Sequence, residues 1–441
     1  MKRVTAAIVA LVALLSLVAV AAGKTTGTAR STGPTKLTLW VGWSARELKV
    51  FKSVVAEYDK AHPNVTVSLV GGINDDKITA AIRSGNVPDV VSSFTSANVG
   101  SYCSSGGWID LAPLLGKSHL SASAFPKTSQ YYTQYKGKRC ALPLLADTYG
   151  LYYNTTLFAA AGITAPPKNF QELTADAKKL TKRNPDGSIK VLGFNPLFAF
   201  YAGNSATMET YAPLFGAKYT DAKGKSTIGK DPAWAKFLKW QKSMVDWYGY
   251  KNLVKFQAGA GDEFSAQNAF ERGKIAMQQD GEWRVAFIAA EHPELQYGTA
   301  PMPTDKPGLY GAGDVNGTIA GIPKGVKHLN EAWDLLRYLT FDTHALAVLS
   351  NGLRNVPSTK ASLTSTEIKP DKHFATFLKI FANPSSKTTP ITAVGNAWGN
   401  LITSFTNKWQ AGKVSNLGAG LKNVDKQIDA QLAQGTAGGT P

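Results

Sequence analysis

The stretch from Tyr135 to Leu180 constrains the fold of this chain more than any other part of it. An apolar run, Cys140 to Leu145, is interrupted by Pro143, and a second apolar run, rich in aromatic residues, follows a few positions later. Because proline cannot donate a hydrogen bond to a central strand ladder, we expect the first strand to lie at a sheet edge or to cross between two bodies. Asp147 and Tyr149 stand between the two runs, where a crossing segment holds them at the mouth of a cleft.

The residues before this stretch alternate between strand and helix patterns. Apolar residues recur at every second position over 37–41 and over 65–69, which predicts two strands. Residues 44–47, with the sequence SARE, form a capping box that opens a helix. A second helix is predicted over 75–83 and a third strand over 87–91. This order predicts α/β winding with a mostly parallel sheet.

In such sheets, ligands bind beyond the carboxyl ends of the strands. The rule therefore points to the residues that follow the first and third predicted strands: Trp40, Gly42, Trp43, Ser44, Thr95 and Ser96.

Three further helices have recognisable starts or patterns. Asn169, with Glu172 three residues later, predicts a capped helix after the opening stretch. Asp231 precedes a proline at the first position of another helix, where proline is tolerated. Residues 264–272 are expected to form a third helix that leads into a buried strand over 275–277.

The N-terminus predicts export. Lys2 and Arg3 precede a run of roughly 19 mostly apolar residues, and Ala19-Val20-Ala21 fits a cleavage site with small residues. Residues 1–21 are therefore interpreted as a signal peptide, and 22–35 as a flexible linker of small and polar residues. The alternative is a membrane anchor, because such a run nearly spans a bilayer. We expect a periplasmic or extracellular protein, with membrane association through an uncleaved signal as the alternative.

The formal net charge is +17, and removal of Lys2 and Arg3 with the signal leaves about +15 (17 − 2). A charge of this size is compatible with nucleic-acid or anionic-polymer binding. The lysines are scattered, however, and no basic run of five and no nucleic-acid motif is present. We interpret the charge as a solvated surface and expect no nucleic-acid partner. Affinity for anionic envelope polymers or for an acidic ligand is the alternative.

The chain has two cysteines, Cys103 and Cys140. An oxidising compartment favours a disulfide between them. Closing a loop of this length contributes roughly 3–4 kcal/mol in the chain-entropy model. Two buried free thiols are the alternative.

Catalytic and metal-binding patterns are absent from the sequence. The six histidines form no HExxH pattern, and there is neither a G-x-S-x-G elbow nor a phosphate-binding loop. A glycosidase needs two carboxylates about 5–10 Å apart; Asp147 could supply one, but the sequence identifies no partner for it. We therefore expect no enzyme, no metal and no cofactor. A secreted carbohydrate-active enzyme is kept as an alternative hypothesis.

Two segments carry a resemblance to a known family. The order of elements from Tyr135 to Leu180 and the segment FERGKIAMQQDGEW, which ends at Trp283, resemble the family 1 extracellular solute-binding proteins of ABC importers. This is the sugar-binding group that includes maltose-binding protein. The similarity spans roughly residues 37–432. It implies that Trp283 stacks on a sugar, whereas a tryptophan of the core is the alternative.

The resemblance implies a periplasmic-binding-protein-like α/β fold, with two α/β lobes, a hinge and a ligand cleft between them. The expected division is signal peptide 1–21, linker 22–35, lobe 1 over 36–146 and 300–350, lobe 2 over 147–299 and 351–432, and a disordered tail over 433–441.

The function that the resemblance implies is binding of a sugar or oligosaccharide outside the cytoplasm, as a monomer, and its delivery to the permease subunits of an ABC importer. The alternatives are a ligand sensor that presents its closed form to a receptor, and a binder of an acidic sugar or a polyol phosphate. By position in the matching motifs, the first candidates for ligand binding are Trp43, Asp147, Tyr149 and Trp283. The others are Trp40, Thr95, Ser96, Phe200, Tyr201, Gly313, Asp314, Arg354 and Trp398.

Overall fold

The computed structural model describes residues 34–197 and 208–437. The expected signal peptide, most of the expected linker, and the candidates Phe200 and Tyr201 lie outside these ranges. Within them, no helix has both the length and the apolar character needed to cross a membrane.

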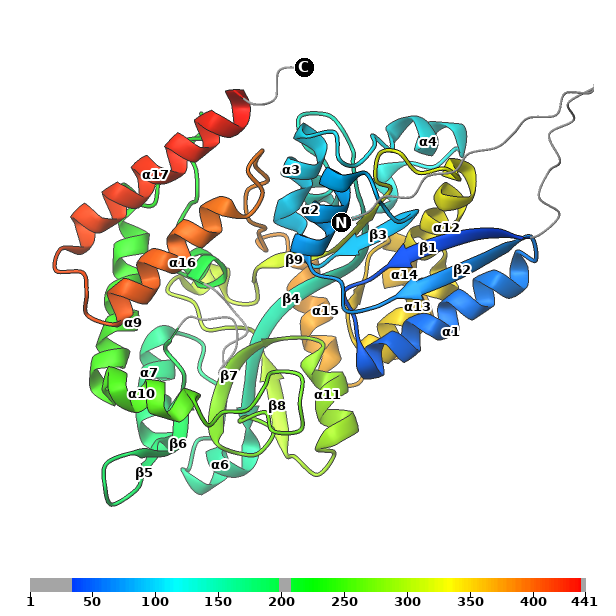
Figure 1. Cartoon of the computed structure of the whole chain (residues 1–441). Coiled ribbons are helices and arrows are strands. Elements are labelled where there is room, and N and C mark those ends of the chain that lie inside the picture. The colour runs from blue at the N-terminus through cyan, green and yellow to red at the C-terminus, as the bar shows by residue number, and fades with distance from the viewer. Residues whose placement is uncertain (1–33, 198–207, 438–441) are drawn as a thin grey trace, which may run out of the picture.

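One long strand, β4 (Leu142–Asn154), connects two lobes. Its first half pairs with β9 (Val315–Gly321) and β10 (Val356–Pro357), and its second half pairs with β7 (Ile275–Gly281) and β8 (Tyr297–Ala300). The strand therefore passes from one lobe into the other (Figure 1). This agrees with the predicted crossing, but the two apolar runs form a single strand instead of two. Pro143 lies where the pairing with β9 shifts register, a position that tolerates proline.

Lobe 1 is built on β1 (Thr35–Trp40), β2 (Val65–Val70) and β3 (Val90–Ser93), which run parallel as predicted. β9 runs antiparallel both to β3 and to the first half of β4, so the sheet is mixed rather than mostly parallel. The helices of this lobe are α1 (Ala45–Ala61), α2 (Asp75–Ser84), η1 (Ser96–Asn98), α3 (Val99–Ser104), α4 (Ala112–Lys117), η2 (Ala122–Ala124), α5 (Lys127–Tyr132), α12 (Leu329–Phe341), α13 (Thr343–Leu353) and α14 (Lys360–Leu363).

Lobe 2 adds β6 (Ile189–Phe194), parallel to β7, and the short β5 (Lys182–Arg183). Its core contains Trp234, Phe237 and Met277. At its outer end, α16 (Ala397–Gln410) and α17 (Leu417–Ala437) pack beside α9 (Pro232–Tyr248) (Figure 1). Its helices are α6 (Thr155–Ala160), α7 (Phe170–Leu180), α8 (Met208–Tyr211), η3 (Ala212–Phe215), α9 (Pro232–Tyr248), α10 (Tyr250–Gln257), α11 (Arg284–Glu291), η4 (Pro307–Leu309), α16 (Ala397–Gln410) and α17 (Leu417–Ala437).

Two helices begin at the capping residues that the sequence predicts. Asn169 Oδ1 accepts hydrogen bonds from the backbone of the first turn of α7. The Glu172 carboxylate, however, accepts from Lys168 N rather than from Asn169 N. Asp231 caps α9, with proline at the first position.

The predicted helix over 264–272 is wrong, because these residues form turns. The Asn268 side chain accepts from Phe270 N and donates to the Glu263 carbonyl. Such side-chain bonds to the local backbone compete with helical hydrogen bonds. The segment therefore forms hydrogen-bonded turns instead of a helix.

The return of the chain to lobe 2 comes later than the expected boundary at residue 351. β10 pairs with the lobe 1 half of β4, and α14 follows it against the lobe 1 helix α13. The crossing is made by α15 (Phe374–Ala382), which places Phe374 and Phe381 in the lobe 1 core and Phe377 and Ile380 in the lobe 2 core. Apolar residues on two faces of one helix thus join the lobes. Helix α17 also continues to Ala437, beyond the expected end at residue 432.

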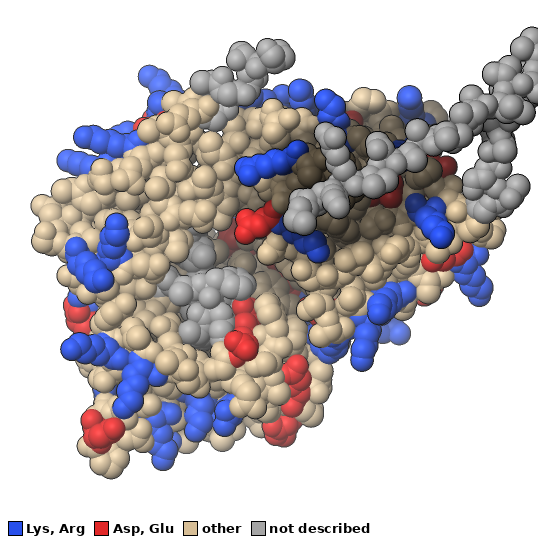
Figure 2. Space-filling view, viewed as in Figure 1, with Lys and Arg blue, Asp and Glu red and all other residues tan. Residues whose placement is uncertain are grey.

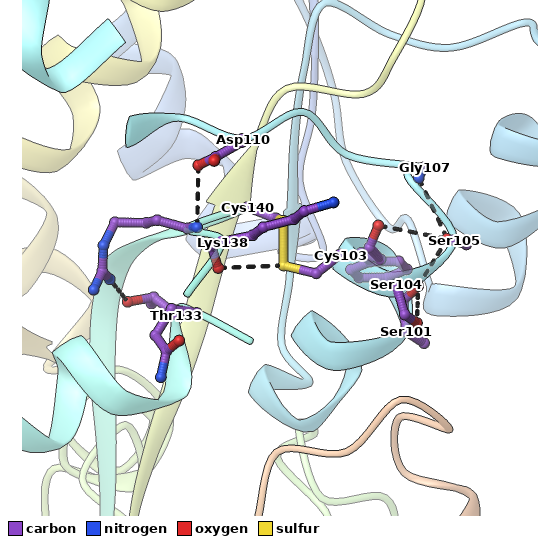
Figure 3. Close-up of a disulfide and its surroundings, with 12 residues drawn as sticks. Ser101, Cys103, Ser104, Ser105, Gly107, Asp110, Thr133, Lys138 and Cys140 are labelled. Atoms are coloured by element: carbon purple, nitrogen blue, oxygen red, sulfur yellow. Dashed lines mark hydrogen bonds between the residues drawn. A yellow bond between two sulfur atoms is a disulfide. The ribbon is translucent and has the colours of Figure 1, made fainter. Parts of the chain in front are cut away.

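Cys103 and Cys140 form the disulfide (Figure 3), with a Cα–Cα distance of 5.5 Å and a sequence separation of 37 residues. This confirms the predicted disulfide and not the alternative of two free thiols. It ties α3 to the segment that enters β4, within lobe 1. Because both ends lie in one lobe, the bridge restrains the unfolded chain without restraining movement between the lobes.

Candidate functional site

A cavity of about 800 Å³ lies between the lobes. A volume of several hundred cubic ångströms is typical of small-ligand sites. Lobe 1 contributes residues 42–47, which lead into α1, and residues 94–97, which follow β3. Both segments begin at carboxyl ends of parallel strands, as the sheet rule predicts. Among the described residues, no group of three His, Cys, Asp or Glu side chains could hold a metal ion.

The remaining residues of the cavity wall come from the crossing segments and from lobe 2. The crossing segments supply Asp147, Tyr149, Asp314, Asn316, Thr318 and Asn355, and lobe 2 supplies Thr210, Phe264, Trp283, Phe287, Glu291, Thr389, Asn396, Asn400 and Thr403.

Aromatic rings lie on both walls of the cavity. On lobe 1, Trp43 stacks on Phe51 with a centroid distance of 4.5 Å and meets Phe94 edge-on at 4.9 Å. On the lobe 2 side, Trp283 meets Tyr149 edge-on at 5.7 Å. Rings held in this way can cover the apolar C–H faces of a ligand.

Two glycines bring aromatic rings close to the backbone. A Cβ at Gly42 would lie 2.3 Å from the Phe94 ring, and a Cβ at Gly281 would lie 2.2 Å from the Trp283 ring. Atoms do not approach so closely without a shift of structure. Glycine at these positions therefore permits the ring placement on each wall.

Asp147 and Glu282 form a buried carboxyl pair at the junction of the lobes. Asn355 Nδ2 donates to Asp147 Oδ1 (2.6 Å) and to Glu282 Oε1 (2.9 Å). The backbone N–H of Thr148 donates to Glu282 Oε2 (2.9 Å). Burial, and then the Asp147 charge, raise the pKa of Glu282 well above its usual range. The closeness of the two carboxyl groups at the junction therefore disfavours ionisation of both at once.

Glu47 is a third carboxyl of the cavity. The sequence predicted a capping role for it, but that prediction is wrong: the Ser44 side chain makes no cap bond, and Ala45 adopts a left-handed backbone with φ 44°. The Glu47 side chain lines the cavity instead. Burial raises its pKa to about 7, although the Arg46 and Arg284 charges oppose this rise.

Arg284 lies beneath the cavity at the start of α11 and is fully buried. Its Nε donates to Asp280 Oδ2 (2.7 Å), and its Nη1 donates to Glu271 Oε1 (2.9 Å). Nη1 also donates to the Glu263 carbonyl at 2.7 Å. One cation thus joins the end of β7, the turn segment after α10 and α11. This network fixes the backbone next to Trp283.

The structure brings seven of the predicted candidates to the cavity: Trp43, Thr95, Ser96, Asp147, Tyr149, Trp283 and Asp314. Their assignment as ligand contacts stays a prediction.

Four other candidates lie elsewhere. Trp40 belongs to β1, where side chains alternate, so its ring packs on the side away from Leu39 and below Lys77. The Arg354 side chain is turned away from the cavity, and its Nη1 donates to the Lys369 carbonyl at 2.8 Å.

Trp398 is buried in the lobe 2 core against Tyr219. The Gly313 N–H donates to Ser386 Oγ, and Gly313 does not line the cavity. The structure therefore removes Arg354 from the sequence argument for an acidic ligand, which combined this residue with the basic net charge.

Sequence reasoning missed several residues of the site, including Glu47, Phe94, Phe264, Glu282 and Asn355. Phe94 directly precedes Thr95 and could have been included by the strand-end rule. Glu282 stands inside the GEW motif, next to the tryptophan that was selected. Asn355 carries no local signal, because its partners are more than 70 positions away.

The raised carboxyl pKa values predict that the ligand-free protein loses stability as the pH rises. A carboxyl whose pKa is higher in the folded than in the unfolded state stabilises the fold below its unfolded pKa and ceases to do so above its folded pKa. The pKa of Asp147 is raised by burial to about 6 and that of Glu47 to about 7. We expect the melting temperature to fall between pH 5 and pH 8, as measured by calorimetry.

Glu282→Gln should reduce this fall, because the variant removes one proton-binding group of the pair. Asp246→Asn, at an exposed carboxylate paired with Lys242, serves as the control and should leave the pH profile unchanged. Identical profiles for Glu282→Gln and the wild type would contradict the prediction.

Comparison with known proteins gives consistent matches. The family of bacterial extracellular solute-binding proteins matches residues 42–344. A maltooligosaccharide ABC transporter solute-binding lipoprotein of Streptococcus pneumoniae is 28% identical over 375 residues, which cover 80% of this chain and 81% of the relative. A maltotriose-binding protein of Pyrococcus abyssi is 22% identical over 407 residues, 90% of this chain and 82% of that protein.

Among solved structures, CpMnBP1 with mannotriose bound is similar with a TM-score of 0.79 and 28% sequence identity. The similarity covers 89% of this chain and 100% of that one.

Proposed function

The chain belongs to the family of bacterial extracellular solute-binding proteins and has their two-lobed α/β fold, and on this basis we propose that it binds a sugar or oligosaccharide for an ABC importer. The ligand would occupy the cleft between the lobes. A membrane permease would then receive it from the protein, which acts outside the cytoplasm as a monomer.

The observation that carries this proposal is the combination of aromatic rings and acceptor groups in one cleft. Sugars present apolar C–H faces, which aromatic rings cover, and hydroxyl groups, which carboxylates and amides bind. The cleft has Trp43 and Phe94 on one wall and Trp283 on the other, and Asp147 and Asn355 at the junction.

The position of the site in the fold also suits a binding protein that closes on its ligand. Asp147 and Tyr149 lie on β4 at the point where the strand leaves one lobe and enters the other. A ligand that contacts Trp43 on lobe 1 and Trp283 on lobe 2 favours the state in which the two walls approach each other. The gain in affinity on closure would thus come from contacts to both lobes.

The proposal is tested by thermal shift and titration calorimetry with neutral manno- and maltooligosaccharides, using protein that begins at residue 22. A ligand at a hundred times its Kd stabilises the folded state by about 2.7 kcal/mol, so a melting temperature increase is expected. Trp283→Ala should weaken the binding of a sugar that gives such an increase. Trp247→Ala, at an exposed tryptophan of α9, is the matched control and should not.

The absence of a shift with every sugar would contradict the proposal for carbohydrates. Equal weakening by the two tryptophan variants would contradict the assignment of Trp283 to the site.

A further inference from the structure

The cleft has two ends, and each is closed by contacts between the lobes. At one end, the Phe287 ring of α11 lies 5.4 Å from the Phe264 ring and 4.4 Å from the Arg46 guanidinium of α1. At the other end, the start of α16 meets lobe 1, where the Asn396 backbone N–H donates to Asn98 Oδ1 at 3.2 Å. Figure 1 places α11 and α16 on opposite sides of β4. The function proposed above gives no role to the α16 end.

One face of α16 lines this end of the cavity with uncharged polar side chains. Asn396, which precedes the helix, Asn400 and Thr403 all belong to the cavity wall. Their spacing of four and three positions places them on the same side of a helix, along about 10 Å of its axis. The opposite side of α16 is apolar, and Trp398 and Ile402 are buried there in the lobe 2 core. The helix thus presents a polar stripe to the cleft.

The side chains of this stripe have hydrogen-bonding capacity to offer a ligand. Asn396 makes no side-chain cap bond to the helix. Neither the Asn400 amide nor the Thr403 hydroxyl bonds to a residue within the described ranges. Asn400 is exposed and the other two are half-buried, so a ligand in the cavity can reach them. Amide and hydroxyl side chains supply both donors and acceptors, as the hydroxyl groups of a sugar do.

The α16 end also differs from the hinge in charge. The wall residues of α16 and the wall residues across from them in lobe 1, 95–97, carry no charge. The helix itself has one charged residue, Lys408, in its last turn. In Figure 2 the surface to the left of the middle, where Figure 1 places α16, shows few Lys, Arg, Asp or Glu side chains. Recognition at this end therefore depends on neutral hydrogen bonds.

We propose that the polar stripe of α16 is a second sugar subsite, which binds hydroxyl groups of a further unit of an oligosaccharide and makes the affinity rise with chain length. The first unit lies between Trp43 and Trp283. The cavity of about 800 Å³ falls toward the upper end of the range for small-ligand sites, about 300–1,000 Å³, and a single sugar ring fills only part of it. This inference rests on the proposed carbohydrate-binding function and specifies oligosaccharides as its substrate class.

A chain-length series tests the substrate class. Glucose, maltose and maltotriose, and mannose with its β-1,4-linked di- and trisaccharides, are titrated calorimetrically. In a series that binds, the best oligosaccharide should bind at least tenfold more tightly than its monosaccharide. Raising the salt concentration should leave this advantage unchanged, because salt screens charges and the stripe carries none.

Asn400→Ala tests the subsite at the level of the residue. Alanine is a better helix former than asparagine, so the variant should remain folded, which circular dichroism checks. Loss of one neutral hydrogen bond should weaken oligosaccharide binding about fivefold, and Asn400→Ala combined with Thr403→Val should weaken it further. The affinity for the monosaccharide, measured directly or by competition, should not change. Asn407→Ala, at an exposed residue of α16 outside the cavity wall, is the matched control and should leave every affinity unchanged.

The outcomes separate the two proposals. If a monosaccharide binds as tightly as its oligosaccharides, the carbohydrate function stands and the inference is wrong. If the double variant keeps the full advantage of the oligosaccharide, or if Asn407→Ala removes as much of it, the assignment of the subsite to the stripe is wrong. If no sugar of either series binds, both proposals fail.

Discussion

Replacing Arg284 with leucine is expected to lower the free energy of unfolding by about 3–5 kcal/mol, the range found when one partner of a buried ion network is removed. The guanidinium is fully buried, and it holds Asp280 at 2.7 Å and Glu271 at 2.9 Å. Glu263 Oε1 lies 3.7 Å from Nη2. Leucine would leave these carboxylates in the interior without their cation. Urea denaturation of the wild type and the variant measures the difference.

Arg337→Leu is the matched control. Arg337 pairs with Asp334 across one turn of α12, and about half of its side chain is exposed. An exposed pair contributes less than about 1 kcal/mol, so this variant should retain nearly all of the stability. Equal losses from the two substitutions would show that Arg284 is not a central support of lobe 2. A stable Arg284→Leu protein with weakened sugar binding would instead assign Arg284 to the positioning of Trp283.

Asp147→Ala is expected to weaken sugar binding at least tenfold, which corresponds to about 1.4 kcal/mol or more. The carboxylate lies on the crossing strand, lines the cavity and is oriented by Asn355. A ligand that bridges the two lobes would therefore lie against the Asp147 carboxylate. Titration calorimetry with a sugar identified in the oligosaccharide panel measures the change.

The same variant should not lose folding stability at pH 7. Burial raises the pKa of Asp147 to about 6, so at pH 7 folding disfavours the ionised carboxylate. Its removal also takes away a negative charge that opposes ionisation of Glu282. We expect a melting temperature equal to or higher than that of the wild type, whereas the affinity falls. Unchanged affinity would refute the role of Asp147, and a large drop in melting temperature would indicate a structural role instead.

Much of the local structure could be predicted from neighbouring residues. The cap at Asn169, the helix that begins after Asp231 and the buried strand that leads to Trp283 depend on side chains a few positions away. The disulfide was predictable from the export that the N-terminus predicts and from the even number of cysteines. The chain segments that supply the first-lobe wall followed from the rule for ligands at the carboxyl ends of parallel strands.

The failures share a cause. Ser44 and Glu47 have the spacing of a capping box, yet the start of α1 directs Glu47 to the cavity. Residues 264–272 have helical composition, yet Asn268 binds the local backbone and Arg284 draws the nearby carboxylates inward. Trp398 has the residue type of a sugar platform, but it packs in a core. In each case the contacts made in the folded chain outweighed the preference read from residue type or spacing.

The sequence by itself determined the two-lobed fold, the crossing strand and the class of chemistry, because periodicity, capping and proline act over a few residues and the family motifs are contiguous. Only the tertiary structure decided which polar groups share one space. Asp147, Glu282 and Asn355 meet across separations of up to 208 positions, and their meeting depends on how β4, β7 and β10 are packed. Burial at that junction, and not residue type alone, then raises the pKa values of the Asp147 and Glu282 carboxyl groups.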